Sequence, residues 1–363
     1  MTDVDAAGFA SRSDIEFDDI VEATKSAFTD ADFADAKSVA NAPFNRFDVY
    51  APARTRVRLS TDAGVYINAN YITAYVDERD AAAAAKRQAA PATPRNAFIA
   101  AQCPFVDNMH HFWQMIIDND VRTVVMLHSQ RDGDAELCTR YFPLRDEGMQ
   151  RYGVADVALV RQIDEENGFT VRRTLRLTLR DGTQRDVEQF HAVGWTDEGP
   201  PSDLSGAAAF TLDVIERARQ QRGSGHDGPV LVHCPTGADN TGAFIATYIG
   251  AERYIDELAA GGTRAQPVPA VDMNAIVAHM LRHRANMLSL QLYLYVHLAV
   301  EAVVDAAMSA NADARRASRD FGGDINKIAK HIHDKEKLNE AVARLQKVSK
   351  RDDGDGDASG SSK

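Results

Sequence analysis

The stretch Leu231-Val-His-Cys-Pro-Thr-Gly-Ala-Asp-Asn-Thr-Gly-Ala-Phe244 decides the fold. It begins as an apolar run that ends at Cys234, passes through a loop that contains Gly237, and continues into an apolar helical segment. In a strand, loop, helix arrangement the N–H groups at the helix N-terminus carry partial positive charge, so they bind an anion and stabilise a nearby thiolate. We therefore expect an α/β fold in which Cys234 faces an oxyanion-binding loop.

The chain on both sides of this stretch alternates between helical and strand patterns. Apolar residues recur at helical spacing in residues 14–40, 108–118, 242–257 and 272–308. Strands are predicted at residues 123–127, 169–179 and 229–233. The alternating pattern of residues 169–179 indicates an antiparallel strand, and the fully apolar run of residues 229–233 indicates a central one.

Length and composition limit the class of protein. With 363 residues and 44% hydrophobic content, the chain can bury one large α/β core or at most two ordinary domains. Residues 1–15 lack the basic start and apolar stretch of a secretory signal, and we find no apolar run long enough to span a membrane. We expect a cytoplasmic protein without stable membrane insertion. Its net charge of -12 argues against nucleic acid as a partner.

The cysteines and histidines suggest neither a disulfide framework nor a metal site. Cys103, Cys138 and Cys234 are odd in number and widely spaced, so we expect reduced thiols, with the first two buried in the core. The histidines lie on helical segments without a cysteine or carboxylate pattern around them. We expect no metal and no cofactor.

The stretch around Cys234 resembles the signature of the Cys-dependent protein tyrosine phosphatases, H-C-S-A-G-x-G-R-T-G. This chain has H-C-P-T-G-A-D-N-T-G at residues 233–242. The resemblance implies that Cys234 is the nucleophile, that His233 and Thr241 tune it, and that Gly237 shapes the phosphate loop. Asn240 stands in place of the arginine that grips the phosphate, and Asp239 stands in place of a glycine.

Several other segments carry the same resemblance, which covers residues 45–300. They are Asn45-Arg-Phe47, Tyr66-Ile-Asn-Ala-Asn-Tyr-Ile72, Phe98-Ile-Ala-Ala-Gln-Cys-Pro104, Val121–Leu127 and Cys138–Pro143. By this resemblance, Phe47 walls the phosphotyrosine pocket.

Two further segments look like the mobile acid loop and the water-positioning loop of the family. In Trp195-Thr-Asp-Glu-Gly-Pro-Pro201, Asp197 stands where the family has its general acid, and Thr196 replaces a stiffening proline. In Arg284-Ala-Asn-Met-Leu-Ser-Leu290, Ser289 replaces the glutamine that positions the hydrolytic water.

The resemblance implies a single phosphatase-like domain over residues 41–308, with a central mixed twisted sheet flanked by helices. We expect residues 1–40 to form a helical lead-in, residues 309–350 a basic helical extension, and residues 351–363 a disordered acidic tail.

Function depends on the missing arginine. A planar guanidinium both positions a phosphoryl group and neutralises its oxygens, and arginine contacts of this kind are worth on the order of 10³–10⁵ in rate. An amide at Asn240 and an extra carboxylate at Asp239 supply neither effect, so we predict a catalytically inactive family member that binds a phosphoprotein or signalling partner. The alternatives are a weak or altered phosphatase acting through Cys234, and a scaffold that works through the basic extension. By resemblance, the setting is signalling in a eukaryotic or host cell.

Overall fold

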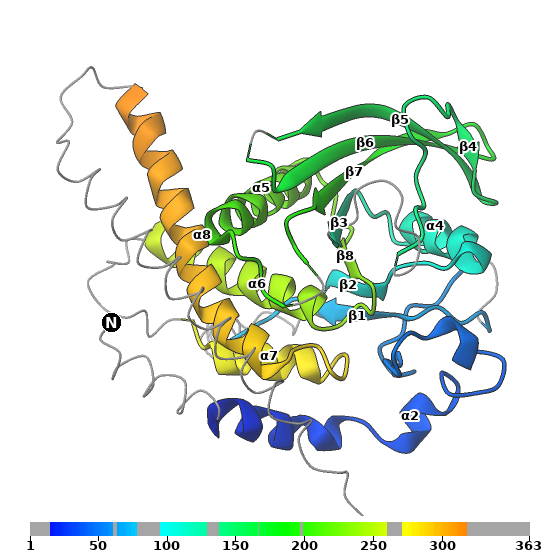
Figure 1. Cartoon of the computed structure of the whole chain (residues 1–363), viewed down its shortest axis with the longest axis horizontal. Helices are drawn as coiled ribbons and strands as arrows, with labels where there is room; N and C mark the ends of the chain where they lie inside the picture. Colours follow the sequence, from blue (N-terminus) through cyan, green and yellow to red (C-terminus); the bar gives the residue numbers. More distant parts are fainter. Residues whose placement is uncertain are drawn as a thin grey trace, which may run out of the picture.

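The structure is a computed structural model that describes residues 15–60, 64–77, 95–128, 138–165, 167–196, 199–259 and 271–317. One eight-stranded sheet runs through it in the order β1-β2-β8-β3-β7-β6-β5-β4 (Figure 1). The strands are β1 (Ala69–Thr73), β2 (Asn96–Gln102), β3 (Thr123–Leu127), β4 (Gln150–Arg151), β5 (Ala155–Asp164), β6 (Thr170–Leu179), β7 (Gln184–Ala192) and β8 (Val230–Cys234).

Helices cover both faces of this sheet. They are α2 (Asp30–Ala34), α4 (Met109–Asp118), α5 (Leu204–Gly223), α6 (Asn240–Ala259), α7 (Met273–Leu281) and α8 (Leu290–Ala317), with short 3-10 turns η1 (Lys25–Ala27), η2 (Ala42–Phe44) and η3 (Val106–Asn108). A further helix occupies residues 15–24.

Alternation along the strands separates two apolar cores. On β3, Val125 and Leu127 belong to the core that contains α5, α6, α7 and α8, whereas Val124 and Met126 belong to the core around α4. Successive side chains on a strand point to opposite faces, so one apolar run serves both cores. This explains why residues 123–127 are apolar throughout.

The sheet is mixed, and its parallel part positions the site. β8 lies between β2 and β3 and is parallel to both, while β6 is antiparallel to β5 and β7. The predictions of a mixed α/β sheet flanked by helices, of a central strand at residues 229–233 and of an antiparallel strand at residues 169–179 are confirmed. Because β2 and β8 run together, Gln102 lies beside Cys234 in register.

The helical segments agree with the sequence patterns except near the C-terminus. The segment predicted as helical over residues 272–308 is two helices, α7 and α8, broken at residues 282–289. The break brings Arg284 and Ser289 to the site. α8 continues to Ala317, and the rest of the predicted extension and the predicted acidic tail lie outside the described residues.

One stretch of α8, Leu290–Ser309, is long and apolar enough to cross a membrane by length and composition, and it is the one such stretch in the described part of the chain. However, 56% of it is buried inside the protein, where α8 packs on α5 and α6. It therefore has the character of a core helix.

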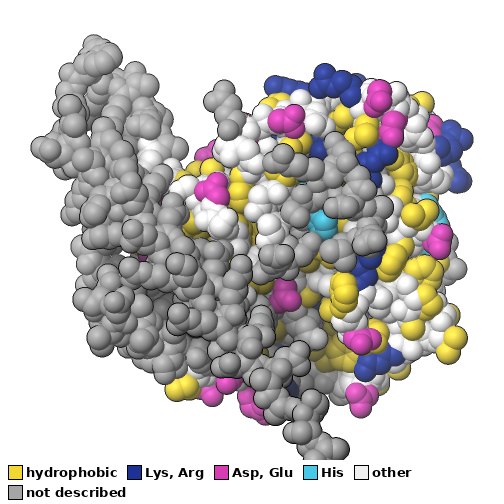
Figure 2. All heavy atoms as spheres, viewed as in Figure 1, with side chains coloured by type: hydrophobic (Ala, Val, Ile, Leu, Met, Phe, Trp, Pro, Cys, Tyr) yellow, Lys and Arg dark blue, Asp and Glu magenta, His cyan; other side chains and the backbone are white. Residues whose placement is uncertain are grey.

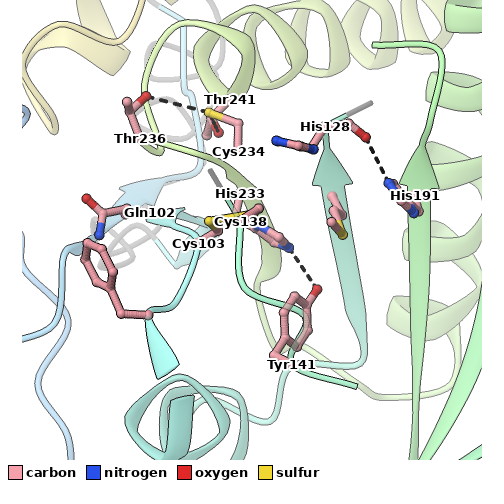
Figure 3. The surroundings of a disulfide bond; sticks show 12 residues. Gln102, Cys103, His128, Cys138, Tyr141, His191, His233, Cys234, Thr236 and Thr241 are labelled. Carbon is pink, nitrogen blue, oxygen red and sulfur yellow. Dashed lines mark hydrogen bonds between the residues drawn. A yellow bond between two sulfur atoms is a disulfide. The ribbon is translucent and has the colours of Figure 1, made fainter. Parts of the chain in front are cut away.

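The prediction that all three cysteines are reduced is wrong for two of them. Cys103, directly after β2, forms a disulfide with Cys138, and their Cα atoms are 5.7 Å apart (Figure 3). The two residues are 35 positions apart in sequence, so spacing alone gave no sign that the segments beside β2 and before Tyr141 meet. Cys234 remains a free, buried thiol.

Candidate active site

The candidate nucleophile lies where β8 ends and α6 begins. Cys234 is 2% exposed, and its backbone C=O accepts a 3.0 Å hydrogen bond from the N–H of Cys103. Residues 234–241, which we call the signature loop, turn the chain from the strand into the helix. Thr241, in the first turn of α6, donates its hydroxyl proton to Cys234 Sγ at 3.2 Å. The structure thus places Thr241 in contact with Cys234, and His233 directly before it on β8.

Behind this loop runs a buried chain of hydrogen bonds that we call the rear network: His233, Tyr141, Gln189, Arg173 and His191. Tyr141 Oη lies 2.8 Å from His233 Nε2 and accepts a 2.7 Å bond from Gln189 Nε2. Arg173 donates to Gln189 Oε1 at 2.9 Å. Figure 3 shows Tyr141 and His233 pointing toward each other beside the disulfide.

The direction of every proton in the rear network follows from Arg173, since a guanidinium only donates. Gln189 must turn its oxygen to Arg173 and its amide to Tyr141, which leaves the tyrosine proton for His233 Nε2. His191 Nδ1, 3.1 Å from Arg173, must likewise accept, so His191 Nε2 donates to the carbonyl of His128 at 2.9 Å. Both histidines are therefore fixed in one neutral tautomer.

Burial keeps these histidines uncharged. Desolvation, reinforced by His191 and His128, lowers the pKa of His233 to about 3. Desolvation and the Arg173 charge lower the pKa of His191 to about 3. At neutral pH neither residue places a positive charge behind Cys234.

Two glycines allow the signature loop to pack as closely as it does. Gly237 has φ +69°, and a Cβ there would lie 2.3 Å from the backbone of Ala101. At Gly242 a Cβ would lie 1.5 Å from the backbone O of Met287. No side chain fits at either position, which explains physically why the motif needs glycine there.

Arg284 is a site residue that the sequence analysis named only as the first residue of a segment. It is 0% exposed and donates to Asn70 Oδ1 at 2.6 Å, to Asn68 Oδ1 at 2.7 Å and to the carbonyl of Thr236 at 2.9 Å. Burial lowers its pKa to about 10, so it stays a cation at neutral pH. The two asparagines of the Tyr66–Ile72 segment thus hold the charge that fastens the signature loop from below.

The side chain of Asn240 is bonded to a neighbouring loop of the protein. Its side-chain amide donates to the backbone carbonyl of Thr196 at 3.3 Å, so it ties the start of α6 to the segment that precedes Asp197. An amide engaged in this way offers no bidentate grip on a phosphate.

Asp239 and Ser289, two of the altered positions, are neighbours in the structure. The hydroxyl and the backbone N–H of Ser289 act on the carboxylate of Asp239 and favour its ionised form. Partial burial nevertheless raises the pKa of Asp239 above its ordinary value. Ser289 directly precedes α8, and its carbonyl accepts from Tyr293 N–H at 2.9 Å. A carboxylate of the protein itself therefore occupies the N-terminus of α8.

The backbone of the signature loop also has fewer donors than its sequence pattern predicts. Pro235 has no N–H, a signal visible in the sequence that our interpretation missed. The N–H of Ala238 is taken by Thr236 Oγ1 at 3.2 Å. The carbonyl of Ala238 accepts from Cys234 Sγ at 3.3 Å.

The remaining predicted site residues are placed less completely. Phe47 is 69% exposed and has φ +50°. Gln102 holds the residues that precede it: Gln102 Oε1 accepts from the N–H of Arg46 at 2.8 Å, and Gln102 Nε2 donates to the carbonyl of Phe44 at 3.0 Å. Its role as a pocket wall stays a prediction. Asp197 lies outside the described residues. Among the described residues, no group of three or more His, Cys, Asp or Glu side chains is placed to hold a metal ion.

Comparison with known proteins agrees with this geometry. The family model of the protein-tyrosine phosphatases matches residues 41–302. Receptor-type tyrosine-protein phosphatase F of Rattus norvegicus is 29% identical over 284 residues, which cover 77% of this chain and 13% of that protein. Receptor-type tyrosine-protein phosphatase alpha of Homo sapiens is 31% identical over 188 residues, 52% of this chain and 20% of that protein. The chain thus spans a small part of these relatives.

Solved structures agree in fold. The catalytic domain of human protein tyrosine phosphatase non-receptor type 18 has a TM-score of 0.62 and 24% identity, and the match covers 81% of this chain and 98% of that one. The same phosphatase in complex with HER2 phosphopeptides has a TM-score of 0.64 and 22% identity over 82% of this chain and 98% of that one. By sequence and by fold, the chain belongs to the protein-tyrosine phosphatase family.

Proposed function

We propose that this family member is catalytically inactive and acts by binding a phosphoprotein or other signalling partner. The observation that carries the proposal is the set of contacts around the signature loop that we call the front contacts: Asn240 to Thr196, and Asp239 to Ser289. Asn240, at the position of the phosphate-binding arginine, is bonded to the protein itself, and the added carboxylate of Asp239 interacts with Ser289. The alterations therefore work together, because each removes part of the grip on an anion.

The charges around the front contacts also support a catalytically inactive site. An ionised Asp239 about 4 Å from a phosphate oxygen would cost roughly 1 to 4 kcal/mol at effective dielectric constants between water and a protein surface. The buried cation Arg284 donates to Thr236 and two asparagines, so it supports the loop from beneath. Its bonds leave it in a structural role.

A partner would then be recognised mainly outside the signature loop. Phosphopeptide binding is named for the non-receptor type 18 phosphatase, whose fold this chain shares. We extend that partner class to this chain with weak dependence on the phosphate, since Pro235 and Ala238 contribute no free amide. An intracellular location is part of the same proposal.

A weak phosphatase is the second candidate, because Cys234 and its contact with Thr241 are retained. Steady-state hydrolysis of an aryl phosphate near neutral pH separates the two candidates. We expect no turnover above background, and the same trace from Cys234→Ser. A rate within about a hundredfold of an active family member, abolished by Cys234→Ser, would establish the weak enzyme instead.

A paired peptide measurement tests the binding role. Tyrosine peptides with and without phosphate, titrated against the protein, are expected to differ by less than about tenfold in Kd, because one charge-assisted contact is worth roughly that factor. A phosphate preference of a hundredfold or more would place phosphate capture at the centre of the function.

A further inference from the structure

A cavity lies at the opposite edge of the sheet from Cys234. It has a volume of about 550 Å³ and is lined by four arginines, Arg122, Arg176, Arg185 and Arg217, together with polar side chains that include His226. We call it the arginine cavity. A volume of this size is in the range of small-molecule sites, roughly 300–1,000 Å³.

The topology separates this cavity from the signature loop. Arg122 directly precedes β3, Arg185 is the second residue of β7, and His226 precedes β8. These three strands are parallel, so their beginnings share one edge and their ends share the other. Cys234 is the last residue of the five-residue strand β8. At about 3.3 Å per residue, it lies about 13 Å along the strand from the edge at which the strand begins.

Acidic residues fix the guanidinium groups in place. Asp120 Oδ1 accepts from Arg122 Nε at 2.8 Å and from Arg185 Nη1 at 2.9 Å. Asp186 holds Arg176 through two parallel bonds of 2.8 and 2.9 Å. The arginines are thus ordered before any ligand arrives, which reduces the entropy lost on binding.

These pairs leave donors of the cavity available. In the described part of the chain, Arg122 pairs with a carboxylate through its Nε–H alone, so its terminal N–H groups remain for a ligand. Arg217 is held by Glu188 at 2.7 Å. The Nε–H groups of Arg185 and Arg217 also have no acceptor among the described residues, but both atoms are buried and do not open into the cavity. Four guanidinium groups face three carboxylates, so the cavity keeps a local positive charge in a chain of net charge -12.

We propose that the arginine cavity binds a small polyphosphate anion. Planar guanidinium groups match the oxygens of phosphate in pairs. Because each arginine already has a carboxylate partner, an anion must offer several charged groups at once to compete, which favours polyphosphates over a single orthophosphate. Basic and acidic side chains are interspersed along the upper and right margins of the face in Figure 2, whereas this cavity gathers arginines in one hollow.

Calorimetric titration of the full chain with inorganic tripolyphosphate tests this assignment. We expect saturable binding of one anion, at least tenfold weaker binding of orthophosphate, and about tenfold losses in Arg122→Gln and in Arg217→Gln. The matched control is Arg145→Gln, an exposed arginine outside the cavity lining, which should bind as the parent does. Circular dichroism of each variant verifies that it is folded.

A second arm distinguishes a free polyphosphate from a lipid headgroup. Phosphatidylcholine vesicles with and without phosphatidylinositol bisphosphate are floated with the protein. If the protein floats only with vesicles that contain this lipid, and Arg217→Gln does not float, the ligand is a lipid headgroup. If the protein binds tripolyphosphate tightly but floats with neither kind of vesicle, the ligand is soluble. No binding of either probe, or equal affinity in the parent and both cavity variants, overturns the proposal.

Discussion

The two sides of the signature loop differ in what they retain of a phosphatase site: the packing behind the loop is intact, whereas the residues in front of it are altered. Behind the loop, the rear network, the two close-packed glycines and Arg284 form a continuous set of bonds that fixes the backbone around Cys234. In front, the front contacts link Asn240 with Thr196 and Asp239 with Ser289. The difference teaches that the fold depends on the rear, whereas the front is free to change once anion binding is no longer required.

The largest effect should come from filling the space behind the loop. Gly242→Ala would place a Cβ 1.5 Å from the backbone of Met287, so we expect a loss of about 3 kcal/mol or more in the free energy of unfolding. Gly223→Ala, in open space at the end of α5, is the control and should cost nothing. Urea denaturation of both variants measures the difference. Equal stability of the two would mean that the loop is not rigidly packed.

Breaking the rear network should cost less. Tyr141→Phe leaves Gln189 Nε2 without its acceptor and His233 Nε2 without its donor, and it should cost roughly 1–3 kcal/mol of unfolding free energy. Tyr152→Phe, in the same apolar core and half-buried, is the matched control and should cost less. If the two changes cost the same in chemical denaturation, the network is not a source of stability.

Acid should weaken the rear through its histidines. The pKa values of His233 and His191 are lowered to about 3 by burial, so the unfolded chain takes up protons first as the pH falls below about 6.5. Their contribution is complete above pH 6.5 and is lost as the pH approaches 3, at about 1.4 kcal/mol per pH unit for each histidine. Unfolding free energies at pH 7.5 and 5.5 measure the slope. A flat profile would show that the histidines are solvated.

The front, in contrast, should tolerate change with a small effect on stability. Asn240→Ala removes one 3.3 Å hydrogen bond, so we expect a cost of less than about 1 kcal/mol. Thermal denaturation beside Tyr141→Phe compares front with rear directly. A cost for Asn240→Ala above that of Tyr141→Phe would reverse the comparison.

Much of the fold was predictable because apolar patterns are local. The periodicity of residues 108–118 corresponds to α4, which begins one residue later, and the apolar run of residues 123–127 corresponds to β3 at its observed bounds. The sequence pattern does not indicate α5, because its buried face includes small residues such as Ala207, Ala208 and Ala218 that mark no clear periodicity. The break between α7 and α8 was also missed, because apolar residues flank it on both sides.

The candidate site was predictable in its residues but not in its contacts. Resemblance located Cys234, Asp239, Asn240 and Ser289, while only the three-dimensional arrangement reveals that Asp239 and Ser289 interact. The disulfide of Cys103 with Cys138 was mispredicted for the same reason, since contacts between distant segments leave no local pattern.

The central claim is that the front contacts, and not the frame behind them, have removed the grip on phosphate. The most direct test compares vanadate binding by the parent and by the double variant Asp239→Gly, Asn240→Arg. The affinity is measured by competition with a fluorescent phosphate analogue. We predict no measurable binding by the parent and binding at least about a hundredfold tighter in the double variant, with smaller gains in each single change. Equal affinity in the parent and the double variant would contradict the account, because the loss would then lie in the frame itself.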